Sequence, residues 1–215
     1  MYGGQTNKKL NEESLFDPKS PYAASKVFAH DITKIYRESY NLFCVNGILF
    51  NHESPFRGET FVTRKISKAV GRIHLGLQNK LTLGNLDASR DWGFAGDYIE
   101  GMWLMMQHDE AEDWVLATGK SYKVSEFAEE AFNQVGLDWS DYVETSEKYL
   151  RPNEVEYLLG DSSKAEKKLG WKAKTSFKEL VKMMVNYDIE MAKQEDVLLK
   201  NNLIKPTWEN PVNKY

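Results

Sequence analysis

A helical pattern that runs directly into an apolar segment limits the fold more than any other feature of the chain. Ser20 suits the N-cap of a helix and Pro21 its first position. Side chains then recur at helical spacing at Phe28, Ile32, Ile35 and Tyr36. Asn41 is expected to end the helix, and LFCVNGILF (42–50) predicts a buried strand. A helix followed by a strand buried on both faces is the closing part of an α/β unit.

The remaining sequence predicts further helices and strands. Thr63 is expected to cap a helix with an apolar stripe at Ile66, Ala69, Val70, Ile73 and Leu77. Ser125 is expected to cap a helix that ends near Gln134, and Asp161 a shorter one that ends at Gly170. Other helices are predicted over 97–108 and 176–194, strands over 80–85 and 113–119, and a polar tail over 201–215.

Composition argues against several classes of function. The 215 residues carry a formal net charge of −4, so a nucleic-acid-binding surface is not expected. No apolar run has membrane-spanning length, and MYGGQTNKKL does not resemble a signal peptide. Cys44 is the one cysteine, so no disulfide can form within the chain, which fits a reducing cytoplasm. The four histidines are scattered without cysteine partners, and no metal site is expected.

The phosphate-binding turn of a dinucleotide fold is missing from the sequence. No Gly-x-Gly-x-x-Gly or Gly-x-x-Gly-x-x-Gly follows a predicted strand. A dinucleotide fold needs that turn so that its backbone can approach the pyrophosphate. Only one clear strand precedes the loop at 51–61. We therefore expect the chain to be truncated at its N-terminus, as from a split or shortened gene.

Tyr22 and Lys26, in PYAASK, stand four residues apart and therefore share one face of the predicted helix. A free tyrosine, with a pKa of about 10, is a poor base at neutral pH, but a nearby ammonium favours the phenolate. Such a pair can act as a general base on a hydroxyl whose carbon gives up hydride to a nicotinamide. Tyr-x-x-x-Lys alone is common, and an ordinary exposed pair is the alternative interpretation.

Longer motifs carry a family resemblance. Residues 20–66 resemble the extended short-chain dehydrogenase/reductases and, within them, the GDP-mannose 4,6-dehydratase family. The similarity continues through GILFNHESP, RGETFVTRKI, LGNLDASRDWGFAGDYIEGMWLMMQ, RPNEV and GDSSKAEKKLGW. It extends from Met1 to about Gln194.

The resemblance implies an α/β fold, in which the C-terminal portion of a Rossmann domain, a doubly wound parallel sheet, joins a smaller mixed α/β substrate-binding domain. Residues 1–50 would belong to the cofactor domain and 51–200 mainly to the substrate domain. Residues 88–108 would pack back on the Rossmann part.

The resemblance also implies roles for individual residues. Tyr22 would be the base on the sugar 4-hydroxyl, and Lys26 would support it and the cofactor ribose. His52 and Arg57 would complete the contacts to the cofactor. The implied cofactor is NADP, because its extra phosphate requires a cation. For His52 alone, the alternative is an ordinary loop histidine.

The implied substrate is GDP-mannose, whose pyrophosphate attracts cations. The family's nucleotide-binding positions correspond to Asn51, Lys65, Leu83, Gly84, Asn85, Arg90, Arg151 and Glu154. Lys65 is near a predicted helix N-terminus, where the helix dipole favours anions, and Glu154 resembles the carboxylate that holds the ribose. Surface salt bridges are the alternative for Arg90 and Arg151. We expect Arg64, Lys68 and Arg72 to form a solvated basic face.

The sequence departs from the family pattern in two places. The family's SPRRGE loop reads SPFRGE, with Phe56 in place of the first arginine, which puts a contact between subunits in doubt. Phe94 and Gly96 stand where relatives often carry polar or basic residues.

The implied reaction moves hydride from C4 of GDP-mannose to NADP, loses water across C5 and C6, returns the hydride to C6, and gives GDP-4-keto-6-deoxymannose with no net use of NADPH. In the family a Thr/Ser-x-Glu that supplies the second base comes directly before the positions of Met1, Tyr2 and Gly3. We therefore expect the chain alone to be inactive. The expected partners are GDP-mannose, further copies in a dimer or tetramer, and a separate N-terminal half.

Three alternatives stay open at this point. The chain could be another nucleotide-sugar dehydratase or epimerase, or a non-catalytic module that binds GDP-sugars or joins intact subunits. It could also be the unstable product of a broken gene, with an exposed sheet edge that favours aggregation.

Overall fold

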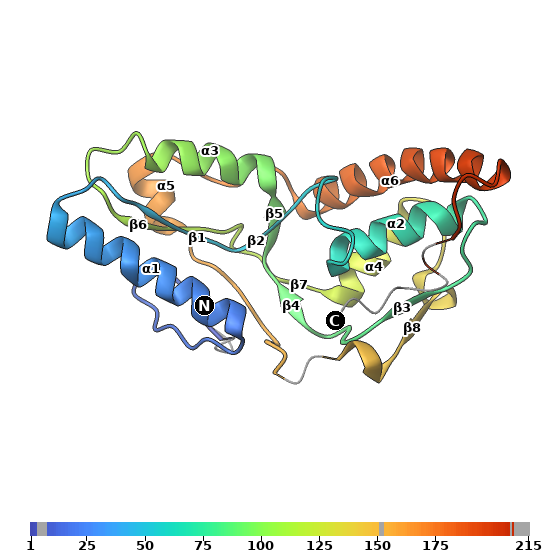
Figure 1. The fold of residues 1–215 in the computed structure, drawn as a ribbon, viewed down its shortest axis with the longest axis horizontal. Coiled ribbons are helices and arrows are strands. Elements are labelled where there is room, and N and C mark those ends of the chain that lie inside the picture. Colours follow the sequence, from blue (N-terminus) through green and yellow to red (C-terminus); the bar gives the residue numbers. More distant parts are fainter. Residues whose placement is uncertain (4–7, 151–152, 207, 209–215) are drawn as a thin grey trace.

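Two lobes lie end to end in the computed structural model, which describes residues 1–3, 8–150, 153–206 and 208 (Figure 1). In the first lobe, β1 (Asn46–Leu49) pairs in parallel with β6 (Asp113–Leu116). Helix α1 (Pro21–Tyr40) lies on one face of this pair, and α3 (Ala95–Met105) and α5 (Ser163–Leu169) lie on the other. Parallel strands need a long crossover, and here the crossover runs through the second lobe.

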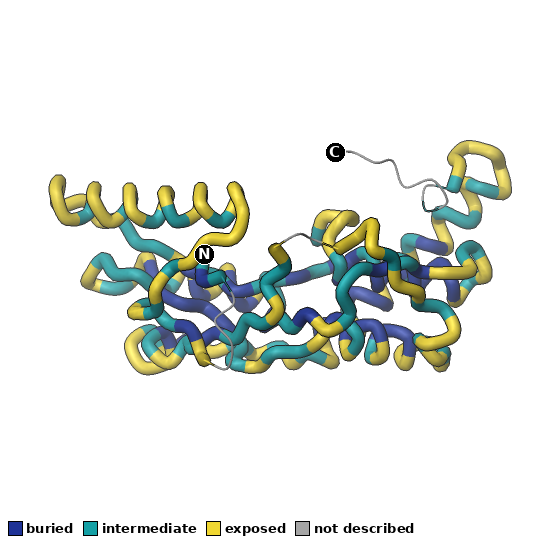
Figure 2. The backbone as a smooth tube through the Cα atoms, turned by 90° about the horizontal axis from the view of Figure 1, so that it is seen from below, coloured by how far each residue is buried: buried dark blue, intermediate teal, exposed yellow. Residues whose placement is uncertain are grey.

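Helix α1 forms as the sequence predicts but buries none of its residues. Ser20 Oγ accepts a hydrogen bond from Ala23 N at 3.1 Å, and Asn41 ends the helix in the left-handed conformation. Figure 2 shows the helix at one end of the molecule in the colours of exposed and half-buried residues. Its large apolar side chains remain exposed, among them Phe28, Ile35, Tyr36 and Tyr40.

A carboxylate of the sheet holds α1 in place. Asp113, the first residue of β6, accepts hydrogen bonds from Arg37 Nη1 and Asn46 Nδ2, both at 2.9 Å. His30 Nε2 lies 3.1 Å from the other oxygen of Asp113. Burial acts to raise the pKa of Asp113, but Arg37 and Asn46 outweigh it and leave the pKa lowered.

Three helices form the core of the second lobe: α2 (Val62–His74), α4 (Val124–Asn133) and α6 (Phe177–Lys200). Beside them, β3 (Leu81–Leu83) pairs in parallel with β8 (Val143–Thr145). Two short 3₁₀ helices, η1 (Trp139–Asp141) and η2 (Glu147–Tyr149), flank β8. The buried side chains that hold these helices together include Ile66, Val70, Phe127, Phe132, Leu180 and Met184.

Short strand pairs connect the lobes. β2 (Asn51–Glu53) pairs in parallel with β5 (Trp92–Phe94), so Asn51 lies opposite Trp92. β4 (Ser89–Arg90) pairs antiparallel with β7 (Tyr122–Lys123). Arg90, the last residue of β4, is two residues before Trp92, and it therefore lies at the same end of the β2–β5 pair as Asn51. No helix among the described residues is both long and apolar enough to cross a membrane.

Several local predictions are wrong in an informative way. The first turn of α2 follows Phe61, and Thr63 is inside it and donates to Glu53 Oε2 at 2.6 Å. Helix α4 begins at Val124, so Ser125 is no cap. Helix α5 follows Ser162, one residue after the predicted Asp161, but Asp161 Oδ1 accepts from Ser163 N at 3.0 Å at the start of this helix. The strand predicted over 42–50 is limited to 46–49, with Leu42 and Phe43 exposed. The left-handed Gly170 at the end of α5 is confirmed.

The basic residues of α2 do not form a solvated face. Arg64 Nη2 lies 2.8 Å from Asp188, and Arg72 binds Glu195 through two nitrogens at 2.7 Å. Lys68 pairs with Glu59 at 2.6 Å and lies 3.6 Å from Glu195. Asp188 and Glu195 belong to α6, so the cations of α2 are largely covered by the carboxylates of the helix that packs on it.

Candidate functional site

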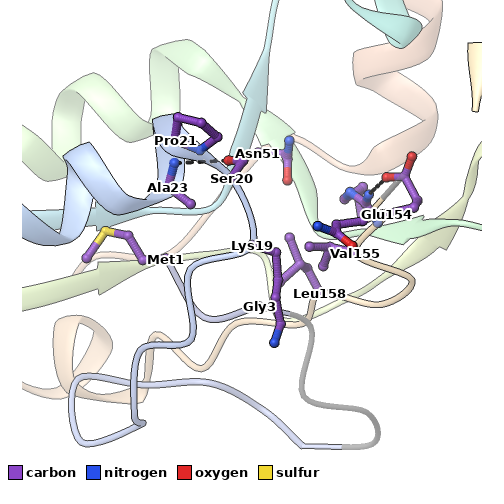
Figure 3. A pocket seen from close by; sticks show the side chains of 12 residues that line it. Met1, Gly3, Lys19, Ser20, Pro21, Ala23, Asn51, Glu154, Val155 and Leu158 are labelled. Carbon is purple, nitrogen blue, oxygen red and sulfur yellow. Dashed lines mark hydrogen bonds and ion pairs between the residues drawn. The ribbon is translucent and has the colours of Figure 1, made fainter. Parts of the chain in front are cut away.

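A pocket of about 490 Å³ lies between the N-terminal end of α1 and the strands that connect the lobes (Figure 3). Arg90 and Glu154 form one part of its wall and are joined by an ion pair of 2.6 Å. The other lining residues are Met1, Gly3, Lys19, Ser20, Pro21, Ala23, Asn51, Asn153, Val155 and Leu158. Three of the sequence-predicted substrate residues, Asn51, Arg90 and Glu154, thus meet in one cavity although they are far apart in the chain.

Tyr22 and Lys26 lie beside this pocket on the first two turns of α1. Lys26 Nζ is 5.5 Å from the centre of the Tyr22 ring, which agrees with one shared helix face. The described wall of the pocket includes Pro21 and Ala23, the neighbours of Tyr22, but not Tyr22 itself. The Tyr22 side chain is 71% exposed. The pair is therefore formed and accessible, but the described residues do not enclose it.

Lys65, Gly84 and Asn85 form a separate group in the second lobe. Lys65 Nζ donates to Thr82 O at 2.6 Å and lies 4.0 Å from the centre of the Tyr149 ring, and burial lowers the pKa of Lys65. A Cβ at Gly84 would lie 2.5 Å from Tyr149 O, so only glycine allows this close approach of two backbones. Asn85 Oδ1 accepts from Asp87 N at 2.9 Å.

Leu83, next to Gly84 and Asn85, can present only its backbone to this group of residues. Its side chain is buried in the core, and its carbonyl accepts from Ser146 N at 2.9 Å. The structure therefore does not bring Lys65 or residues 83–85 into the lining of the pocket that holds Arg90.

His52 and Arg57 follow β1 and are both held by neighbours. His52 Nδ1 lies 2.9 Å from Phe50 O, and its ring stacks on Tyr98 with 5.2 Å between ring centres. Arg57 Nε lies 3.1 Å from Glu53 Oε2, and its guanidinium lies 3.6 Å from the centre of the Phe61 ring. These contacts fix Arg57 just beyond the end of β2.

Comparison with known proteins identifies the family. The sequence profile described as GDP-mannose 4,6 dehydratase matches residues 1–184. This chain belongs to the GDP-mannose 4,6-dehydratase family. GDP-mannose 4,6 dehydratase 1 of Arabidopsis thaliana is 58% identical over 195 residues, which are 91% of this chain and 54% of that protein. The Homo sapiens GDP-mannose 4,6 dehydratase is 48% identical, over 89% of this chain and 56% of its own length. The chain thus spans about half the length of the relatives it matches.

Solved structures confirm the α/β fold class expected from the resemblance. RMD from Pseudomonas aeruginosa, complexed with NADPH, superposes with a TM-score of 0.80 at 21% identity, covering 88% of this chain and 63% of that one. A dTDP-glucose 4,6-dehydratase from Bacillus anthracis in complex with NAD gives 0.79 at 19% identity, over 89% and 60% of the two chains. At these identities the likeness shows the fold alone.

Two buried carboxylates near the site of this dehydratase-family chain were missed by the sequence reasoning. Glu53 is 2% exposed, and burial raises its pKa although Thr63 and Arg57 act to lower it. Asp91 accepts from Thr118 N and Oγ1 and from the backbone N–H groups of Gly119 and Gly160. Burial raises the pKa of Asp91 against these hydrogen bonds. An acid among aromatic and apolar neighbours, as in SRDWGF, is the signal that could have found it.

The structure explains one of the two departures from the family pattern. The Phe94 ring occupies the place that a Cβ on residue 96 would need, so Phe94 and Gly96 fit as a pair. Phe56 is exposed, with its ring 5.7 Å from that of Tyr187 in an edge contact. Arg151 is outside the described residues. No group of three or more His, Cys, Asp or Glu suited to a metal occurs in the part of the chain that the structure describes.

Proposed function

We propose that this chain is the substrate-binding part of a GDP-mannose 4,6-dehydratase. The observation that carries the proposal is the pocket in which Asn51, Arg90 and Glu154 face the N-terminal end of the helix that bears Tyr22 and Lys26. The relatives at 58% and 48% identity, both GDP-mannose 4,6-dehydratases, support it. The proposed reaction converts GDP-mannose to GDP-4-keto-6-deoxymannose by loss of water.

Tyr22 is assigned the proton transfer at the sugar 4-hydroxyl. Its phenol is accessible at the start of α1, and the Lys26 ammonium lies on the same helix face. A neighbouring ammonium stabilises the phenolate that takes the proton. Removal of this proton makes departure of hydride from C4 easier.

Arg90, Asn51 and Glu154 are assigned to the nucleotide side of the substrate. The guanidinium of Arg90 provides positive charge for the diphosphate, and the carboxylate of Glu154 provides acceptors for ribose hydroxyls. Their 2.6 Å ion pair keeps both groups in one place in the pocket wall. Lys65 and Arg151 are assigned to the nucleotide as further cations, and the backbone of residues 83–85 is assigned to the guanine.

A nicotinamide cofactor fits the residues present only in part. Tyr22 and Lys26 would face the nicotinamide ribose, and His52 and Arg57 would form further contacts. The fixed guanidinium of Arg57, held between Glu53 and Phe61, is a suitable partner for an anionic group. When bound, the cofactor supplies the hydride acceptor. We propose NADP rather than NAD; a fold neighbour was solved with NADPH, and others with NAD.

Calorimetric titration of GDP and GDP-mannose into the purified chain tests this proposal, with UDP- and dTDP-sugars as controls. Saturable binding that is selective for guanine is the expected result. Equal binding of all nucleotide sugars, or no binding by a chain that circular dichroism shows to be folded, would refute it. Because the 215 residues contain no glycine-rich phosphate-binding turn, we expect weak NADP binding and no turnover by this chain alone.

We also propose that the enzyme is a homo-oligomer, and that the part of the relatives that this chain does not match is needed for activity and can be supplied as a separate polypeptide. The exposed apolar side chains of α1 support additional packing at the first lobe, as does the stripe of Ile99, Met102 and Trp103 on α3, which Met106 continues just beyond the helix. Light scattering coupled to gel filtration measures the molar mass and so tests the proposed oligomer. An assay of GDP-mannose dehydration tests the second proposal, with this chain mixed with a polypeptide that comprises the part of a relative that the chain does not match.

A further inference from the structure

We propose that Lys19 is a substrate-binding residue, and that its ammonium binds the phosphate nearer to the hexose of a nucleoside diphosphate sugar. This inference rests on the proposed function and adds a residue to the same site. Lys19 lines the 490 Å³ pocket together with Arg90, and the two cations come from different segments of the chain. No family motif considered above assigns it a role.

The backbone at Lys19 is fixed on both sides. After it, Ser20 caps α1 through the hydrogen bond from Ala23 N. Before it, Asp17 N donates to Met1 O at 2.9 Å, and Gly3, at φ 67°, lies so close to Asp17 that a Cβ there would overlap the Asp17 carbonyl. The ammonium thus extends from an anchored segment beside the pocket.

The present partner of Lys19 holds it only weakly. Lys19 Nζ lies 2.8 Å from Asp17 Oδ2, with the two side chains 46% and 51% exposed. An ion pair this exposed contributes little, so exchange of the carboxylate for a phosphate costs little. The diphosphate of a nucleotide sugar carries two negative charges, one on each phosphate, so as a whole it attracts an ammonium more strongly than a single carboxylate does.

The arrangement of the pocket indicates which of the two phosphates of the nucleotide sugar Lys19 would bind. Figure 3 shows Glu154, joined to its ion-pair partner, on one side of the pocket and the start of α1 with Ser20 and Pro21 on the other. If Glu154 holds the ribose and Tyr22 faces the 4-hydroxyl of the hexose, the diphosphate spans the distance between them. Lys19 precedes Tyr22 by three residues, so these two assignments place its charge at the phosphate that bears the hexose.

Calorimetric titration of GMP, GDP and GDP-mannose into wild type, Lys19→Met, Lys19→Arg and Lys34→Met tests the inference. We expect Lys19→Met to weaken the binding of GDP and GDP-mannose about tenfold and the binding of GMP less than about threefold. The affinities of Lys19→Arg should be close to those of the wild type. Lys34 is the matched control: it is 51% exposed and pairs with a carboxylate, Glu38, at 3.9 Å, but it does not line the pocket.

Each of the other outcomes contradicts a specific statement. Unchanged binding of GDP-mannose by Lys19→Met overturns the inference and leaves the proposed function standing. Equal weakening of GMP and GDP overturns the assignment to the hexose-side phosphate. Failure of the wild type to bind any guanine nucleotide refutes the proposed function itself, and the inference with it.

Discussion

Replacing Asp188 by alanine should destabilise the second lobe strongly. Its carboxylate is completely buried between α2 and α6, and Arg64, its partner at 2.8 Å, is 8% exposed. Arg64 Nε also donates to it at 3.1 Å, and Ser67 Oγ at 2.5 Å. Removing one partner of a buried pair leaves an uncompensated charge and typically costs about 3–5 kcal/mol. Arg64 keeps acceptors in the carbonyls of Pro55 and Arg57, so we expect the lower value, about 3 kcal/mol.

The assay is urea unfolding followed by circular dichroism. A domain of ordinary stability has about 5–15 kcal/mol, so Asp188→Ala should remain folded in buffer but unfold at a clearly lower urea concentration. Asp196→Ala is the matched control on the same helix, because Asp196 pairs at 2.6 Å with an exposed lysine, Lys200; it should cost less than about 1 kcal/mol. The double variant Arg64→Met/Asp188→Leu, which has no buried charge, should recover part of the loss. An Asp188→Ala variant within about 1 kcal/mol of wild type would refute the reasoning.

Three other predictions test separate contacts. Burial acts to raise the pKa of Glu112, but two lysines of α5 outweigh it and lower the pKa from 4.5 to about 2. The ionised Glu112 therefore stabilises the fold above about pH 4.5, and this stabilisation is lost as the pH falls toward 2. Glu112→Gln should flatten that part of the acid-unfolding curve. Gly96→Ala should destabilise by about 1–3 kcal/mol through overlap with the Phe94 ring, and Phe94→Ala should relieve most of that cost in a double-mutant cycle measured in urea. Gly84→Ala must displace Tyr149, since the new Cβ would lie 2.5 Å from its carbonyl, and it should weaken GDP binding in calorimetry about tenfold.

Local rules predicted the helices well where the chain itself supplies the cap. Ser20 accepts from Ala23 N, as its predicted N-cap role requires. The helix predicted from residue 176 also has its own cap, a reciprocal capping box of Ser176 and Glu179, which was not among the predicted caps. The same rule failed at Thr63, because its hydroxyl has a better acceptor in Glu53, ten residues earlier. Hydroxyl side chains mark helix starts only when no buried acceptor competes for them.

Pairing across long sequence separations accounts for most of what could not be predicted. Arg64 and Asp188 are 124 residues apart, and neither helix alone shows that its charges face the other. The same holds for the site. Family motifs placed Asn51, Arg90 and Glu154 among the substrate residues, but only the pairing of β2 with β5 and the return of the chain after β8 bring them into one pocket. The buried acids Glu53 and Asp91 were missed because the partners that satisfy them, apart from the i+4 residue Arg57, come from other segments.

For the pair of Tyr22 and Lys26, the sequence predicts that the two residues share a helix face but not the direction in which that face points. Their common helix face follows from spacing alone, and the structure reproduces it. The direction in which that face points depends on how α1 sits on the sheet, and α1 contributes no buried residue to settle this. Asp113 does so instead, by accepting hydrogen bonds from Arg37 at one end of the helix and from Asn46 of the sheet. A sequence can therefore indicate a candidate catalytic pair from one short segment, while the orientation of that pair depends on a carboxylate 76 residues beyond Arg37.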